Sequence, residues 1–253
     1  MTTRNDGTSP AARLPTASEL RLVIFDCDGV LFESWKANVA FYDAVLATLG
    51  LPPLDEEARR LCHTLSSPQL YAHLFRDDPQ MQQRMAETAR RTDYGPFYAL
   101  MEPADELEPT LRRLRAHCPL ALATNRGTTV RGVVERFGLA EFFPICMGIL
   151  DVPRPKPAPD LLLGCLDRAG IRPSEAVYVG DTELDRAAAA AAAVSYVGVG
   201  DRSGASAVCA SCRRCCSVTA MVLPSTTREY VAVETAQRTL TSNACGPFSP
   251  GRT

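Results

Sequence analysis

The sequence predicts an α/β protein: a doubly wound parallel sheet with an inserted all-helical cap domain. Short apolar runs of strand length alternate with helical patterns in two parts of the chain. The runs lack polar alternation, as expected for strands that helices cover on both faces. Between the two parts, residues 32–101 show helical spacing and no strand-like run, and prolines divide them into pieces. We therefore assign residues 21–31 and 102–200 to the core and residues 32–101 to the cap.

Composition limits the classes of function. The chain has 253 residues, 46% of them hydrophobic, enough for one sizeable core and a smaller domain. The formal net charge is −2, which provides no overall field for nucleic acid or an anionic membrane, so we expect a small-molecule partner. Residues 1–20 are polar and lack an apolar segment. We interpret them as a flexible tail and expect a cytoplasmic protein without a signal peptide or spanning helix.

The first strand runs into two carboxylates. An unbroken apolar run from Leu22 to Phe25 is followed by Asp26 and Asp28, and then by Gly29. Ligands of parallel sheets bind beyond the carboxyl ends of the strands, and residues two apart share one side of an extended chain. The pair suits a nucleophile with an acid/base partner, or the binding of a hard cation. Turn or capping residues are the alternative for the pair taken alone.

The remaining elements follow in strand-then-helix order. A helix from Lys36 to Leu49 opens the cap, and further helical pieces reach residue 100. Glycines at 50, 138 and 170 terminate helices. In the second part of the core the pattern predicts helix Glu106–Ala116, strand Leu120–Ala123, helix Thr128–Phe137, a weaker strand Ile145–Leu150, helix Leu161–Ala169, strand Ala176–Val179, an alanine-rich helix to Ala193 and strand Val194–Val199.

Polar residues follow two later strands. Thr124 and Asn125 offer a hydroxyl and backbone N–H groups near a helix start, which suits phosphate oxygens, although taken alone the pair favours a plain helix cap. Asp181 and Asp185 stand four residues apart at another helix start, so that their side chains share a face. Capping accounts for one acid there, and two beside a strand end favour a cation site.

Lys156 is notable because the chain carries its positive charge almost entirely as arginine. Its only lysines are Lys36 and Lys156, and the second stands between two prolines. A compact ammonium can lie between two anions as a point charge, where the planar guanidinium fork is less suited. Chance placement is the alternative.

Taken in order, these motifs resemble one known family. Asp-x-Asp-Gly-Val, Thr-Asn, Lys-Pro-Ala-Pro-Asp and Gly-Asp-x-x-x-Asp, within residues 21–200, are similar to the haloacid dehalogenase-like hydrolases. The similarity is greatest to the branch with a helical cap after the first motif, which includes phosphoglycolate phosphatases. The resemblance implies a Rossmann-like core and a hydrolase that acts on a small phosphorylated metabolite.

The resemblance also implies a role for each matching residue. Asp26 would attack phosphorus and form an aspartyl-phosphate, while Asp28 would protonate the leaving oxygen and then activate water. Asp26, Asp181 and the backbone carbonyl of Asp28 would hold Mg²⁺, supported by Asp185. The phosphoryl group would be bound by Thr124 and the Asn125 backbone, with Lys156 offsetting charge.

Two other functions stay open. A phosphosugar mutase of the β-phosphoglucomutase kind would share all four motifs. The acid at Asp28 argues against cleavage of carbon–halogen or carbon–phosphorus bonds, but it does not separate phosphatase from mutase. A non-catalytic phosphometabolite-binding protein is the third class. The substrate, which the cap would select, and the oligomeric state are not predicted; polar candidates in the cap are Lys36, His63, Tyr71 and His73.

The resemblance ends near Gly200. Residues 201–253 are Cys-rich, with Cys209, Cys212, Cys215 and Cys216 close together, and lack periodicity and histidine. The spacing fits a zinc or iron–sulfur site poorly. We interpret the segment as a poorly ordered tail, produced by a frameshift. The idea fails if no family-like ending emerges when the gene is read in its other frames.

Overall fold

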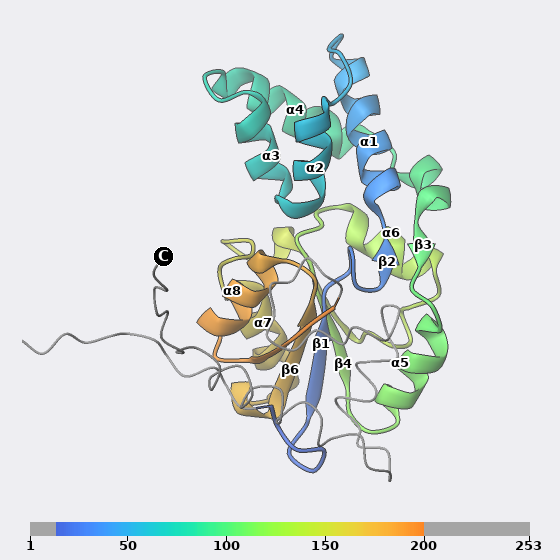
Figure 1. Ribbon diagram of the computed structural model, residues 1–253, viewed down its shortest axis with the longest axis vertical. Coiled ribbons are helices and arrows are strands. Elements are labelled where there is room, and N and C mark those ends of the chain that lie inside the picture. Colours follow the sequence, from blue (N-terminus) through green and yellow to red (C-terminus); the bar gives the residue numbers. More distant parts are fainter. Residues whose placement is uncertain (1–13, 200–253) are drawn as a thin grey trace, which may run out of the picture.

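A five-stranded parallel sheet forms the centre of the protein (Figure 1). The computed structural model describes residues 14–199, apart from the side chains of His63 and Thr64. The strands lie in the order β5-β4-β1-β6-β7, with β1 in the middle. Their bounds are β1 Leu22–Phe25, β4 Leu120–Ala123, β5 Ile145–Met147, β6 Ala176–Gly180 and β7 Ser195–Gly198.

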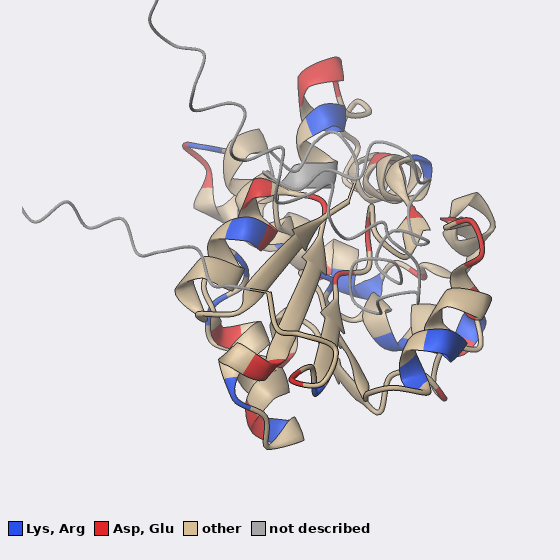
Figure 2. Cartoon of the chain, turned by 60° about the horizontal axis from the view of Figure 1, so that its bottom comes forward, with Lys and Arg blue, Asp and Glu red and all other residues tan. Residues whose placement is uncertain are grey.

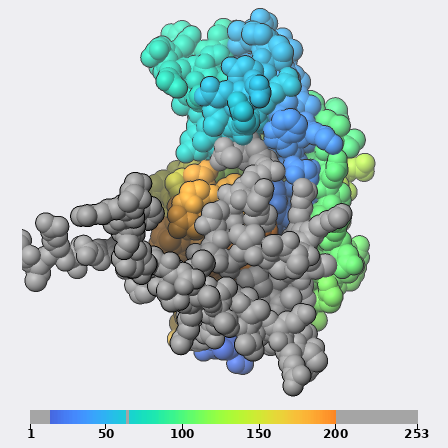
Figure 3. All heavy atoms as spheres, viewed as in Figure 1, coloured from blue at the N-terminus to red at the C-terminus, as the bar shows by residue number. Residues whose placement is uncertain are grey.

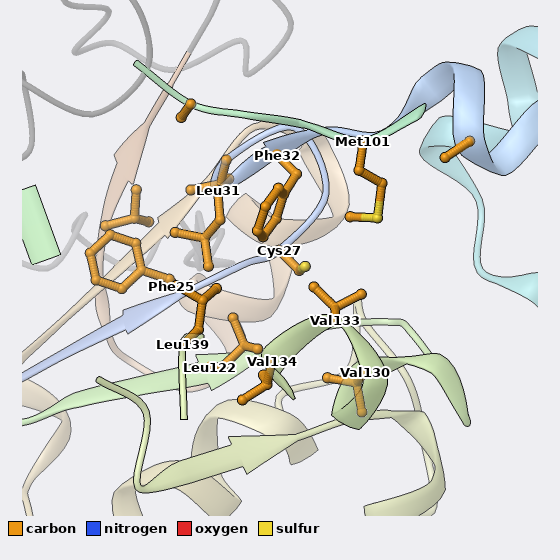
Figure 4. Close-up of a cluster of buried hydrophobic side chains, with 14 of the residues drawn as sticks. Phe25, Cys27, Leu31, Phe32, Met101, Leu122, Val130, Val133, Val134 and Leu139 are labelled. Carbon is orange, nitrogen blue, oxygen red and sulfur yellow. The ribbon is translucent and has the colours of Figure 1, made fainter. Parts of the chain in front are cut away.

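Helices cover both faces of this sheet, which explains the apolar runs. Leu22 and Ile24 of β1 pack in one buried cluster with α7 (Asp160–Ala169) and α8 (Glu183–Ala191). Val23 and Phe25 point to the other face, where their cluster includes α5 (Leu107–Arg115) and α6 (Thr129–Arg136). Figure 4 shows side chains of β1, β4 and α6 gathered in this second cluster. Alternate residues of one strand therefore serve two cores.

The cap is a group of helices inserted between β1 and α5, and it stands above the carboxyl ends of the strands (Figure 1). Figure 3 shows its atoms, blue to cyan, at the top of the molecule. Leu70 and Met85 are fully buried inside it, and Phe41, Tyr42, Tyr71, Tyr94 and Phe97 form a chain of aromatic contacts. Its elements are α1 Trp35–Thr48, α2 Glu56–Thr64, α3 Ser67–Leu74, α4 Pro79–Arg91 and the 3₁₀ helix η1 Gly95–Leu100.

The two connections between cap and core lie side by side. β2 (Phe32–Glu33) pairs antiparallel with β3 (Glu102–Pro103), and the Ala104 amide donates to the Leu31 carbonyl at 2.9 Å. Backbone hydrogen bonds thus hold the two connections to each other. This short ribbon is absent from the sequence prediction, because two-residue strands carry no detectable periodicity.

The predicted fold class is confirmed, a parallel sheet with a helical insertion. The largest difference lies at Ile145–Leu150, where the strand stops at Met147 and residues Ile149–Asp151 form the 3₁₀ turn η2. The Asp151 carboxylate accepts from the Gly148 amide at 2.8 Å, which ends the extended conformation. Another 3₁₀ turn, η3, spans Pro173–Glu175. The domain bounds stay a prediction. Residues 1–13 of the tail predicted at 1–20, and all of the tail predicted at 201–253, lie outside the described residues.

Charged residues of both signs are interspersed over the described helices (Figure 2). Many form exposed ion pairs, such as Arg112 with Glu108 and Arg154 with Asp160. Among the described residues, no helix has the length and apolar character needed to cross a bilayer.

Candidate active site

The site lies where the carboxyl ends of the strands face the cap. A cavity of about 260 Å³ is lined from the core by Asp26, Asp28, Thr124, Asn125 and Lys156. Residues of α1, α3 and α4 line it from the cap side. Five of the seven predicted site residues therefore meet in one cavity, although they come from three separate parts of the sequence.

Asp26 occupies the first position beyond β1. Its amide donates to the Val179 carbonyl at 2.9 Å, so the residue continues the strand and lies buried at the carboxyl end of the sheet. Its Oδ1 lies 2.8 Å from the Lys156 ammonium. Burial raises the pKa of the Asp26 carboxyl to about 7; Lys156 opposes the rise and the neighbouring carboxylates add to it. A further cation beside Asp26 would favour its charged, nucleophilic form.

Lys156 joins two carboxylates. Its Nζ lies 2.6 Å from Asp185 Oδ1 and 2.8 Å from Asp26 Oδ1, and it also donates to the Tyr178 hydroxyl at 2.9 Å. Although burial opposes it, these two carboxylates raise the Lys156 pKa above its usual value, so the side chain is an ammonium. The point-charge geometry expected from the choice of lysine is present.

Asn125 acts on Lys156 through its side chain. Its Oδ1 accepts from the Lys156 amide at 2.9 Å, and its Nδ2 donates to the Lys156 carbonyl at 3.1 Å. These two hydrogen bonds fix the loop that carries the lysine. The predicted phosphate contact of the Asn125 backbone is a separate matter and stays a prediction, as does that of Thr124, whose Oγ1 accepts from the Arg126 amide at 3.2 Å.

Three buried aspartates gather beside the cavity. Asp26, Asp181 and Asp185 place carboxylate oxygens within 4.8 Å of one another. Asp185 is held by other groups: its Oδ1 accepts from Lys156 and Tyr178, and its Oδ2 accepts from Thr182 Oγ1 at 2.5 Å. Despite burial, these partners hold the Asp185 pKa below its usual value, with Lys156 the strongest of them. Both Asp185 oxygens are thus engaged by protein donors, and its role in supporting a metal stays a prediction.

This donor set fits a hard divalent cation. Carboxylate oxygens are the ligands that Mg²⁺ prefers, and several negative charges buried so close together repel one another unless a cation lies among them. The turn after β1 leaves room for them: Gly29 has φ +76°, and a Cβ there would lie 2.0 Å from Asp181 Oδ2. Glycine is therefore needed at this position for the backbone conformation and for space.

Sequence reasoning missed two residues of the site. Arg126 forms a two-point ion pair with Asp28, and the fully buried Tyr178 hydroxyl donates to Asp185 at 2.7 Å. The signals were an arginine directly after Thr-Asn and a tyrosine in an otherwise aliphatic strand. Neither signal names its partner, because the partners lie elsewhere in the chain.

Of the polar cap residues predicted as candidates, the structure places one at the cavity and two away from it. Tyr71 lines the cavity. Lys36 forms an exposed ion pair with Glu102, and His73 lies 3.8 Å from Glu57, both away from the cavity lining. The His63 side chain lies outside the described part.

Comparison with known proteins identifies the family. Residues 23–199 match the family model described as haloacid dehalogenase-like hydrolase. The chain therefore belongs to the haloacid dehalogenase-like hydrolases, as the order of its motifs predicted.

Individual proteins and a solved structure are also similar to this chain. A phosphoglycolate phosphatase from Pseudomonas putida is 32% identical over 187 residues, covering 71% of this chain and 69% of the relative. Pyrophosphatase PpaX from Halalkalibacterium halodurans is 28% identical over 66% of this chain and 77% of the length of PpaX. The crystal structure of a subfamily IA hydrolase from Geobacter sulfurreducens, 36% identical, superposes with a TM-score of 0.58 over 74% of this chain and 90% of its own.

Proposed function

We propose that this hydrolase is a Mg²⁺-dependent phosphomonoesterase that acts on a small phosphorylated metabolite, in the manner of a phosphoglycolate phosphatase. The observation that carries the proposal is the position of Asp26: a buried carboxylate at a strand end, paired with Lys156, with the acid Asp28 in the same cavity. Relatives named as phosphatases support it. The cytoplasmic location expected from the sequence stays a prediction.

In the first step, a carboxylate oxygen of Asp26 attacks phosphorus, and the bond from phosphorus to the ester oxygen breaks. One oxygen of Asp28 carries a proton while the other keeps its bond to Arg126, and that proton passes to the leaving oxygen, which departs as an alcohol. In the second step, Asp28 takes a proton from water as that water attacks phosphorus. The bond from Asp26 to phosphorus then breaks, inorganic phosphate leaves, and both residues return to their starting states.

The other residues support these steps. Lys156 holds Asp26 and offsets the charge of the incoming phosphate. The Thr124 hydroxyl and the Asn125 backbone, which line the same cavity, would bind the phosphoryl oxygens. Mg²⁺, when bound by Asp26, Asp181 and the Asp28 carbonyl, neutralises charge between carboxylate and phosphate. Asp185 would support the metal through water or hydrogen bonds.

The organic part of the substrate would face the cap. There the Tyr42 and Ser67 hydroxyls bond to each other at 2.8 Å, and most other lining residues are apolar, such as Phe41 and Leu65. A screen of phosphorylated metabolites against the purified protein would find the substrate. Sugar-phosphate isomerisation outrunning phosphate release would identify the mutase instead.

Hydrolysis of p-nitrophenyl phosphate with Mg²⁺ tests the proposed nucleophile. Asp26→Asn keeps the shape but removes the attacking charge, so we expect a loss on the order of 10³-fold or more in kcat, with no aspartyl-phosphate trapped. Asp167→Asn changes an exposed aspartate and serves as the matched control. Full activity in Asp26→Asn, with deamidation and contaminating enzyme excluded by mass spectrometry, would contradict the mechanism. Ligand binding by the unmodified protein without turnover would indicate a binding protein.

A further inference from the structure

Arg126 forms a two-point ion pair with the side chain of Asp28. Its Nε donates to Asp28 Oδ2 at 2.8 Å and its Nη2 to Oδ1 at 2.6 Å, in the paired geometry typical of guanidinium and carboxylate groups. Arg126 is only 7% exposed although it lines the cavity. Asp26 and Asp28 therefore have separate cations, Lys156 for the first and Arg126 for the second.

The same guanidinium contacts residues near both ends of the inserted cap segment. It lies 3.4 Å from the Asn38 Oδ1 of α1 and 3.4 Å from the hydroxyl of Tyr94, just before η1, whose ring centroid is 5.1 Å away. Tyr94 in turn donates to Asn38 at 2.9 Å. Asn38 and Tyr94 stand at the beginning and near the end of the inserted segment. One core side chain thus joins Asp28 to the two places where the cap enters and leaves.

The backbone of Arg126 is held as firmly as its side chain. Its carbonyl accepts from the Ile149 amide at 3.0 Å, and a Cβ on Gly148 would lie 2.5 Å from that carbonyl oxygen. The remaining terminal nitrogen, Nη1, lies 3.3 Å from Thr129 Oγ1. Each nitrogen of the guanidinium is therefore engaged by a protein group, which favours an action through Asp28 over a direct contact with substrate.

We infer that Arg126 is a positioning residue: it keeps hold of one oxygen of the Asp28 carboxyl while the other oxygen, protonated, serves the ester, and it couples this placement to the seating of the cap. The inference rests on the proposed function, since it needs Asp28 to be the acid. A carboxyl misplaced by about 1 Å loses on the order of 10²-fold in rate. The loss falls on substrates whose leaving oxygen needs a proton.

Two esters of nearly equal size separate this role from a structural one. Phenyl phosphate has a poor leaving group that depends on Asp28, whereas p-nitrophenyl phosphate has a good one that depends on it little. We expect Arg126→Met to lower kcat/KM for phenyl phosphate on the order of 10²-fold, and for p-nitrophenyl phosphate less than about tenfold. Arg126→Lys, which keeps the charge without the fork, should fall between Arg126→Met and the natural protein.

A double-mutant cycle supplies the second measurement. In an Asp28→Asn background there is no acid left to position, so Arg126→Met or Arg126→Lys should change the release of p-nitrophenol in a single turnover very little. Arg131→Met, on the exposed side of α6, is the control and should leave both esters unchanged. If Arg126→Met fails to fold, as circular dichroism would show, Arg126→Lys carries the comparison.

Equal losses on both esters, or the same loss with and without the Asp28 acid, would overturn the positioning role. Failure of the natural protein to hydrolyse either ester would instead reject the proposed phosphatase, and this inference with it. Phosphatase activity that is insensitive to Arg126 would leave the proposed function standing and reject only the inference.

Discussion

Lys156 shows how one buried cation controls this site. Its ammonium lies between Asp26 and Asp185, and the exposed fraction of its side chain is only 3%. Removing one partner of a buried ion pair leaves the other charge uncompensated, which costs about 3–5 kcal/mol. Here a single substitution would leave two carboxylates without their shared cation, while the hydrogen bonds of Asp185 to Thr182 stay in place.

We therefore expect Lys156→Met to lower the free energy of unfolding by about 3–5 kcal/mol, measured by urea denaturation in the presence of EDTA. The matched control is Lys36→Met, because the only other lysine forms an ion pair with Glu102 in which both side chains are 63% exposed. Such a pair contributes about 1 kcal/mol or less. Equal destabilisation by the two substitutions would show that Asp26 and Asp185 tolerate the loss of their shared cation.

At the scale of elements, the turn after β1 determines where the carboxylates meet. Gly29 and Gly50 have nearly the same backbone conformation, φ +76° and +73°, but different surroundings. A Cβ at Gly29 would lie 2.0 Å from Asp181 Oδ2, whereas a Cβ at Gly50 would meet nothing within 4 Å. The two glycines therefore separate backbone strain from displacement of Asp181.

Both Gly29→Ala and Gly50→Ala should lose about 1–2 kcal/mol of stability from the left-handed backbone alone. Only Gly29→Ala should also weaken Mg²⁺ binding, on the order of tenfold, because it displaces a carboxylate of the proposed metal site. Isothermal titration with Mg²⁺ measures this directly, independently of turnover. Unchanged Mg²⁺ affinity in Gly29→Ala would place the cation away from Asp181.

For the whole molecule, the proposed metal site predicts that Mg²⁺ binding and folding are linked. A cation that binds only the folded state, at a concentration 100 times its Kd, adds about 2.7 kcal/mol to stability. For a chain of this size each kcal/mol corresponds to a rise of about 2–4 °C in Tm. EDTA-treated protein should thus gain roughly 5–10 °C on saturation with Mg²⁺.

Thermal unfolding with and without Mg²⁺ checks this shift. Asp181→Asn should lose most of it, since the substitution removes one of the three clustered carboxylates, while Asp167→Asn should keep it. A full shift in Asp181→Asn would argue that Mg²⁺ acts at another place on the protein.

The sequence by itself determined the sheet, the order of its units and the positions of the acids at the strand ends. These features depend on local information: apolar runs show a strand such as Leu22–Phe25, and the residue after the strand lies at the sheet edge wherever the strand is placed. Asp26, Thr124 and Asp181 could be proposed in this way. The point charge of Lys156 followed from the rarity of lysine in the chain.

Only the tertiary structure decided which groups pair inside the site. Arg126 and Asp28 stand 98 positions apart, and Asn125 and Lys156 stand 31 apart, so no periodicity connects them. Their pairing depends on how the loops after β1, β4 and β5 converge under the cap. Side-chain direction and burial choose the partners there, because a buried charge or amide must find a partner within hydrogen-bond distance. That requirement acts in three dimensions, and for this reason Arg126 became visible only once the chain was folded.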